Sequence, residues 1–189
     1  TVLKSVDTNV AVGLSVPDFS ITITGPSYPS GDTKVFNQTN GMEQTWENLI
    51  PGTYTVTESG VAAPWSVVID PETFDVESGE DTTVDVTVTN TYATGSLTVL
   101  KDVETNGAIG LTVPDFSITV TGPSYPSGDT KIFNQTNGME QTWGNLIPGT
   151  YTVTESGISA PWSVVIDPES YDVTGGEDTV VDITVTNTY

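Results

Sequence analysis

Apolar and polar residues alternate over short stretches along most of the chain. The pattern is clearest near residue 90, where Val84, Val86 and Val88 lead to Asn90 and Tyr92 while aspartate and threonine fill the positions between them. Alternate residues of a β-strand share a face, and an apolar face packs into a core. No stretch shows a sustained helical period, so the pattern predicts an all-β fold.

Comparable strands, separated by Gly, Pro, Asn and Ser turns, are expected along the first half of the chain. They cover residues 2–6, 19–24, 34–38, 42–46, 52–58, 65–69, 74–76 and 82–92. Asn40-Gly41 separates two of them and is a strong signal for a two-residue hairpin turn. About seven short strands in about 92 residues predict a small antiparallel, Ig-like β-sandwich.

The chain repeats itself with a displacement of 97 residues (101 − 4). Roughly sixteen of the 92 aligned positions differ, most of them mildly, and no insertion or deletion is needed. The sequence therefore predicts two tandem β-sandwich domains, 1–92 and 97–189, joined by a short linker over 93–96. The expected partners of each domain are neighbouring repeats of the same chain, stacked as a stiff rod.

Three polar residues of each repeat lie on the apolar faces of three separate strands. Lys4 falls between Val2 and Val6, Glu58 follows Tyr54 and Val56, and Asn90 follows the valines named above. Their counterparts in the second repeat are Lys101, Glu155 and Asn187. A buried ammonium or carboxylate is costly unless it is paired, so this pattern needs a chemical reason.

One hypothesis explains all three residues together, namely a covalent bond between the lysine and the asparagine. Burial favours the neutral amine, which is a nucleophile, and the asparagine carboxamide is its electrophile. A protonated Glu58 or Glu155 would act as the catalytic proton shuttle. The alternative is that these are strand-end residues whose polar heads reach water. The chain has only four lysines and no arginine, and two of the four lie on apolar faces, which favours the bond.

These segments resemble the Cna-B-type (SpaA-type) repeat of bacterial surface proteins and pilins. The similar pieces are 1–4, a lysine strand; 52–58, with Tyr54, Val56 and Glu58 spaced as in the family's acid motif; and 86–91, an asparagine strand. The resemblance implies a β-sandwich, an isopeptide cross-link Lys4–Asn90 and another Lys101–Asn187. It also implies a structural stalk or spacer role in an extracellular, cell-surface adhesin or pilus.

Composition narrows the function classes further. The formal net charge of −21 argues against nucleic-acid and anionic-membrane partners, and we expect a monomer in solution. With no cysteine there can be no disulfide, and with no histidine a serine or threonine nucleophile lacks its usual base. We expect neither an enzyme nor a cofactor, and no metal is assigned.

Two alternatives remain open at this stage. Four tryptophans, Trp46, Trp65, Trp143 and Trp162, could form a carbohydrate-binding surface, or they could simply pack into the core. The acidic segment 77–81 could bind Ca²⁺ and stiffen a spacer without cross-links, although its spacing does not match an EF-hand loop.

Overall fold

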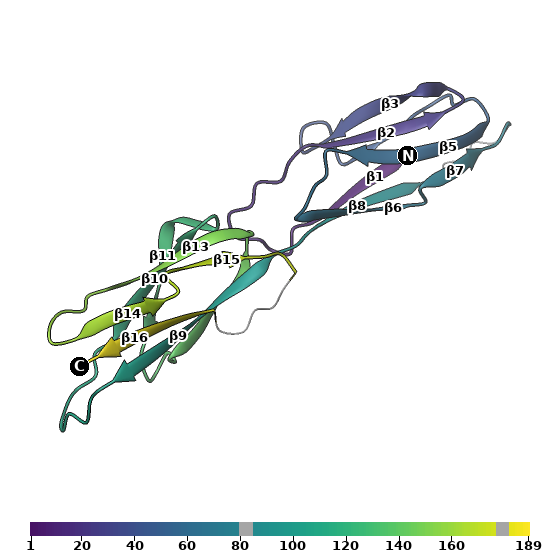
Figure 1. Ribbon diagram of the computed structural model, residues 1–189. Coiled ribbons are helices and arrows are strands. Elements are labelled where there is room, and N and C mark those ends of the chain that lie inside the picture. The colour runs from purple at the N-terminus through teal and green to yellow at the C-terminus, as the bar shows by residue number, and fades with distance from the viewer. Residues whose placement is uncertain (80–84, 177–181) are drawn as a thin grey trace. The chain divides into compact units, whose positions relative to one another are not determined.

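The computed structural model describes residues 1–79, 85–176 and 182–189. Within these residues the regular elements are all β-strands, and the chain divides into two compact units. One unit comprises Thr1–Asn9 and Ser15–Tyr92, and the other comprises Val10–Leu14 and Ala93–Tyr189. Each unit contains two four-stranded sheets (Figure 1). The prediction of an all-β sandwich fold is confirmed.

The two sheets of the first unit have the strand orders β4-β1-β8-β6 and β3-β2-β5-β7. Their strands are β1 (Val2–Asp7), β2 (Phe19–Gly25), β3 (Tyr28–Phe36), β4 (Glu43–Gln44), β5 (Gly52–Ser59), β6 (Trp65–Asp70), β7 (Thr73–Val76) and β8 (Val86–Tyr92). Neighbouring strands are antiparallel except β1 and β8, which run parallel. The first and last strands of the repeat are therefore direct neighbours.

The second unit repeats this arrangement with the orders β12-β9-β16-β14 and β11-β10-β13-β15. Its strands are β9 (Gly95–Glu104), β10 (Phe116–Gly122), β11 (Tyr125–Phe133), β12 (Glu140–Leu146), β13 (Gly149–Ser156), β14 (Ser163–Asp167), β15 (Ser170–Val173) and β16 (Ile183–Thr188). The parallel pair is β9 and β16. Strand β9 begins inside the segment 93–96 that the sequence suggested as a linker.

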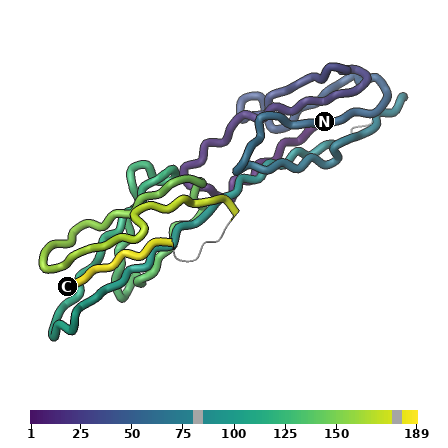
Figure 2. The backbone as a smooth tube through the Cα atoms, in the orientation of Figure 1, coloured from purple at the N-terminus to yellow at the C-terminus, as the bar shows by residue number. Residues whose placement is uncertain are grey.

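The predicted hairpin around Asn40-Gly41 is wrong. Gly41 forms only an isolated bridge with Asn37, and β4 pairs with β1 in the opposite sheet rather than with β3. The reason is local, since the Asn37 side-chain oxygen accepts hydrogen bonds from the Thr39 and Asn40 N–H groups at 3.0 and 2.7 Å. These bonds build a wider loop that carries the chain from one sheet to the other (Figure 2).

Each unit buries its own apolar core between its two sheets. In the first unit this core includes Phe19, Ile21, Phe36, Tyr54 and Val88, all at most 3% exposed. Equivalent residues form the core of the second unit. The described residues contain no helix of the length and apolar character that a membrane span requires.

Val10 is held in an unfavourable backbone conformation. Its φ is +53° and its side chain is 78% exposed, whereas Gly107 stands at the same place in the second repeat with a φ of +75°. A β-branched residue in the left-handed region costs on the order of 1–3 kcal/mol. Glycine adopts the region freely but gives up more chain entropy on folding.

We therefore expect Val10→Gly to raise the free energy of unfolding by about 1 kcal/mol. Urea denaturation followed by tryptophan fluorescence measures this change. The matched variant, Gly107→Val, should lower the free energy by a similar amount. Loss of stability in Val10→Gly would show that the Val10 side chain contributes more than the strain costs.

Candidate functional site: a buried Lys–Glu–Asn cluster

The parallel pairing of β1 with β8 places Lys4 and Asn90 side by side. Lys4 lies opposite Val88 and Asn90 lies opposite Val6, so the two polar residues are diagonal neighbours on one sheet face. Lys4 is 3% exposed and Asn90 is fully buried. The valines around them hold this register, because a shift by one residue would move the whole apolar set to solvent.

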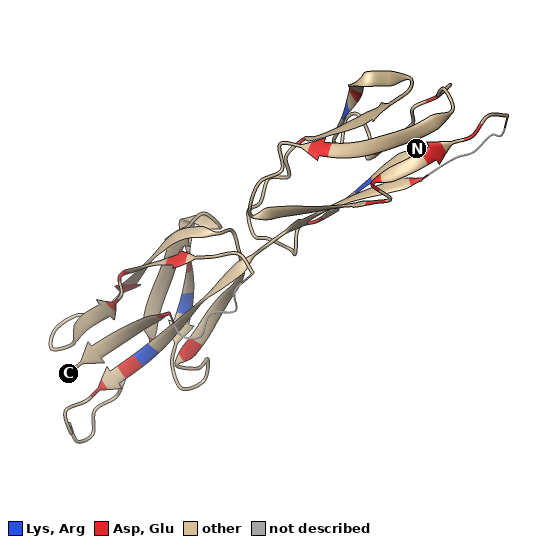
Figure 3. Ribbon diagram, turned by 45° about the vertical axis from the view of Figure 1, so that its right-hand side comes forward, with Lys and Arg blue, Asp and Glu red and all other residues tan. Residues whose placement is uncertain are grey.

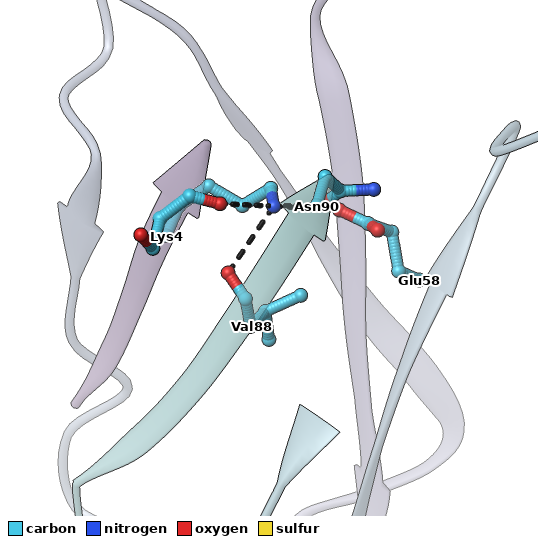
Figure 4. Close-up of polar contacts among 5 residues, drawn as sticks. Lys4, Glu58, Val88 and Asn90 are labelled. Atoms are coloured by element: carbon cyan, nitrogen blue, oxygen red, sulfur yellow. Dashed lines mark hydrogen bonds and ion pairs between the residues drawn. The ribbon is translucent and has the colours of Figure 1, made fainter. Parts of the chain in front are cut away.

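The amine of Lys4 points at the side chain of Asn90 (Figure 4). Lys4 Nζ contacts Asn90 Oδ1 and also donates to the carbonyl oxygens of Val88 at 3.2 Å and Ser5 at 3.1 Å. The ring of Phe19 closes the site, with its centroid 4.4 Å from Nζ. The amine and the amide carbonyl are thus held together in a site closed to water.

Glu58 reaches the same point from the opposite sheet. Its strand, β5, places it opposite Ile21 of β2, and Glu58 Oε1 lies 3.6 Å from Lys4 Nζ with both side chains fully buried. Among the described residues, no group gives either Glu58 carboxylate oxygen a hydrogen bond of ordinary geometry, and Asn90 Nδ2 also has no such partner. Buried polar groups are normally satisfied, so these unpaired atoms single out the cluster as a candidate functional site.

The second repeat builds the same cluster from Lys101, Glu155 and Asn187. Lys101 Nζ donates to the carbonyl oxygens of Val185 at 2.9 Å and Asp102 at 2.8 Å, and it lies 4.0 Å from Glu155 Oε1. The Asn187 amide forms no hydrogen bond of ordinary geometry with any described residue. The structure therefore brings all six of the predicted residues together, three in each core.

Burial shifts the pKa values of Lys4, Lys101 and Glu155 in favour of their neutral forms. Loss of hydration lowers the pKa of Lys4, and Glu58 opposes this only in part. The pKa of Lys101 falls to about 8 for the same reason, against the opposing charges of Glu155 and Asp102. Burial raises the pKa of Glu155, against the effects of the Asn187 amide and the Lys101 charge. These shifts favour the neutral amine on both lysines and the protonated carboxyl on Glu155.

The sequence reasoning missed the aromatic wall over the amine. Phe19 covers Lys4, and Phe116 covers Lys101 with its centroid 4.3 Å from Nζ. Phe19 alternates with Ile21 and Ile23 and is therefore recognisable as inward-facing, but the sequence alone does not show which core residue meets the lysine.

The other two lysines, Lys34 and Lys131, each form a separate structural contact with a tryptophan. Figure 3 shows how few basic positions (blue) the strands carry beside the acidic ones (red). Lys34 Nζ lies 4.6 Å from the Trp46 ring and donates to Thr45 O at 2.6 Å. Trp46 is 8% exposed, and its indole N–H donates to Asp32 at 2.6 Å. The second repeat forms the same contact with Trp143, which is 1% exposed. These two tryptophans pack into the cores instead of presenting flat surfaces to a sugar.

The remaining tryptophans, Trp65 and Trp162, are partly buried. Trp65 packs edge-on against Phe19 and Tyr92, with ring centroids 5.8 and 4.8 Å away. Glu80 and Asp81 of the proposed calcium segment lie outside the described residues. Within the described part of the chain, no group of three or more acidic side chains is arranged to hold a metal ion.

Comparisons with known proteins agree with this architecture. A family model described as a SpaA-type prealbumin-like fold domain matches residues 92–189. Among solved structures, the major pilin protein T-13 of Streptococcus pyogenes is 15% identical, with a TM-score of 0.50 over 99% of this chain and 95% of that one. A second major pilin of that species is 17% identical, with a TM-score of 0.52 over 98% and 95%. A search of curated protein sequences found no match.

Proposed function

Because the chain belongs to the SpaA-type family of prealbumin-like surface repeats, we propose that it is a stalk or spacer segment of a cell-surface adhesin or pilus-like protein. Each repeat is locked by an autocatalytic isopeptide bond, Lys4–Asn90 in the first and Lys101–Asn187 in the second. The observation that carries this proposal is the contact of Lys4 Nζ with the Asn90 carboxamide inside a closed apolar site. The pilin architecture of the two similar structures supports the stalk role.

The bond-forming step is a single-turnover reaction within the folded domain. Lys4 Nζ attacks Asn90 Cγ as the neutral amine, and Glu58 donates a hydrogen bond to Oδ1 as negative charge develops there. Glu58 then gives its own proton to Nδ2 and recovers one from Nζ, so that one proton moves in net from the amine to the departing amide nitrogen. The Cγ–Nδ2 bond breaks, ammonia leaves, and an amide joins the two side chains. The lack of a hydrogen-bond partner at Nδ2 among the described residues suits its role as the leaving group.

The position of the bond suits a load-bearing module. The cross-link would join the neighbouring first and last strands, β1 and β8, across a sequence separation of 86 residues. A pulling force that enters at Lys4 would leave at Asn90 through covalent bonds. The hydrogen bonds and the core between these positions would then carry little of the load.

Intact mass tests the proposal directly. Each bond removes one ammonia, so the purified chain should be lighter than its sequence by roughly 17 Da per repeat, or about 34 Da for both. Peptide mapping should recover the Lys4 segment joined to the Asn90 segment. An unshifted mass in folded protein contradicts the cross-link, and a Lys101–Asn90 peptide contradicts its assignment within one repeat.

A further inference from the structure

Three asparagines of the chain are followed by glycine. They are Asn40, Asn106 and Asn137. At such a pair the backbone nitrogen of the glycine can attack the asparagine side-chain carbonyl and expel ammonia, because glycine has no side chain to hinder the approach. The reaction needs a glycine N–H that is free of other bonds and a backbone that is free to turn.

Two of the three pairs are restrained by the loop that joins the sheets. The Gly41 N–H donates to Asn37 O at 2.9 Å, and the Gly138 N–H donates to Asn134 O at 2.8 Å. The side chains of Asn40 and Asn137 also donate, each at 3.2 Å, to Val35 O and Ile132 O. Attack at either pair therefore requires several hydrogen bonds to open together.

The third pair lies in an open turn directly after β9. Asn106 and Gly107 are both exposed, and both have positive φ, +50° and +75°. No group in the described part of the chain accepts a hydrogen bond from the Gly107 N–H. The position that a Cβ would take on Gly107 has nothing within 4 Å. Among the residues that the structure describes, the Asn106 side chain has one hydrogen-bond partner, with Nδ2 donating to Tyr189 O at 3.0 Å.

We propose that Asn106 is a site of spontaneous deamidation, a chemical change confined to the second repeat. Gly107 N attacks Asn106 Cγ, the N–H proton passes through solvent to the departing amide, and ammonia leaves a five-membered succinimide. Water then opens the ring to give aspartate or isoaspartate at position 106. This proposal is independent of the isopeptide bond, which uses different asparagines and a different nucleophile.

The first repeat carries the same turn in a form that resists the reaction. Asn9 holds the last strand in the same way, with Nδ2 donating to Tyr92 O at 2.8 Å, but Val10 follows it. The branched side chain of Val10 shields its backbone nitrogen. Deamidation at Asn106 replaces the Nδ2 donor by a carboxylate that cannot bind Tyr189 O, so Tyr189 loses one of its contacts in the second repeat only and keeps its backbone bond to Glu104 O.

The test is to age the purified full chain in mildly alkaline buffer prepared with water that carries a heavy oxygen isotope, and then to map its peptides. The Asn106 peptide should acquire the heavy oxygen about tenfold faster than the peptides of Asn9, Asn40 and Asn137, as expected from the open turn and the bonded glycines elsewhere. A methyltransferase specific for isoaspartate should label the same peptide.

Two reciprocal variants separate this chemistry from general instability. Gly107→Val should slow the reaction at Asn106 about tenfold, and Val10→Gly should create a new site at Asn9. Circular dichroism before ageing checks that both variants are folded. If Asn40 or Asn137 reacts at least as fast as Asn106, or if Gly107→Val leaves the Asn106 rate unchanged, the proposal is overturned.

Discussion

Glu58→Ala is expected to abolish the cross-link of the first repeat and leave that of the second intact. Glu58 Oε1 lies 3.6 Å from Lys4 Nζ, and among the described residues no other carboxylate forms an ion pair with that amine. Without this carrier, the amine cannot deliver its proton to the departing amide nitrogen. Intact mass should then fall short of the sequence value by roughly 17 Da instead of about 34 Da.

The duplication supplies matched controls for this result. Glu155→Ala should block only the second bond, and the double variant should show no loss of mass. Glu58→Gln keeps the volume and a hydrogen-bond donor but cannot shuttle protons, so it should behave like Glu58→Ala. When the exposed Glu47 is replaced by alanine, the deficit relative to the sequence mass of that variant should stay at about 34 Da. Full mass loss in Glu58→Ala would assign the proton transfer to another group.

The sequence predicted the inward position of the six cluster residues because each continues a series of apolar residues at two-residue spacing. Lys4 between Val2 and Val6 cannot turn outward without exposing both valines. The inward position follows from local spacing alone, whichever strands are neighbours. The contact between Lys4 and Asn90 depends in addition on the parallel pairing of β1 with β8, which joins the two ends of the repeat. Alternation alone does not reveal that pairing.

Two strand assignments in the first repeat are wrong for a similar reason, since local sequence signals do not show which strands pair. Asn40-Gly41 resembles a hairpin turn, but the side-chain bonds of Asn37 and the pairing of β4 with β1 override it. Strand β3 begins at Tyr28, whereas the sequence predicted a strand only from residue 34. The prediction starts too late because Pro29, Ser30 and Gly31 resemble a turn. An edge strand tolerates such residues, since one of its sides makes no ladder hydrogen bonds.

Removal of the cross-link should have the largest effect on stability. In the double variant Lys4→Met/Glu58→Gln, methionine fills the apolar path of the lysine and glutamine avoids an unpaired buried charge. The bond would close a sequence separation of 86 residues, and by analogy with a disulfide its loss costs about 4–5 kcal/mol in chain entropy. For a unit of this size the melting temperature of the first repeat should fall by roughly 20 °C or more.

Scanning calorimetry can resolve this change within a single molecule. The two repeats are nearly identical, so the intact second repeat serves as the internal reference, and the variant should show two transitions where the parent chain shows one or two close together. Lys101→Met/Glu155→Gln should lower the other transition instead. Lys34→Met is the control, because it removes an amine that lies over Trp46 but outside the cluster. It should shift the first transition by only a few degrees, since one cation–π contact is worth about 1 kcal/mol. If Lys34→Met and Lys4→Met/Glu58→Gln shift the first transition equally, Lys4 acts as an ordinary packed side chain. The reason is that only a covalent bond restricts the whole unfolded segment between Lys4 and Asn90.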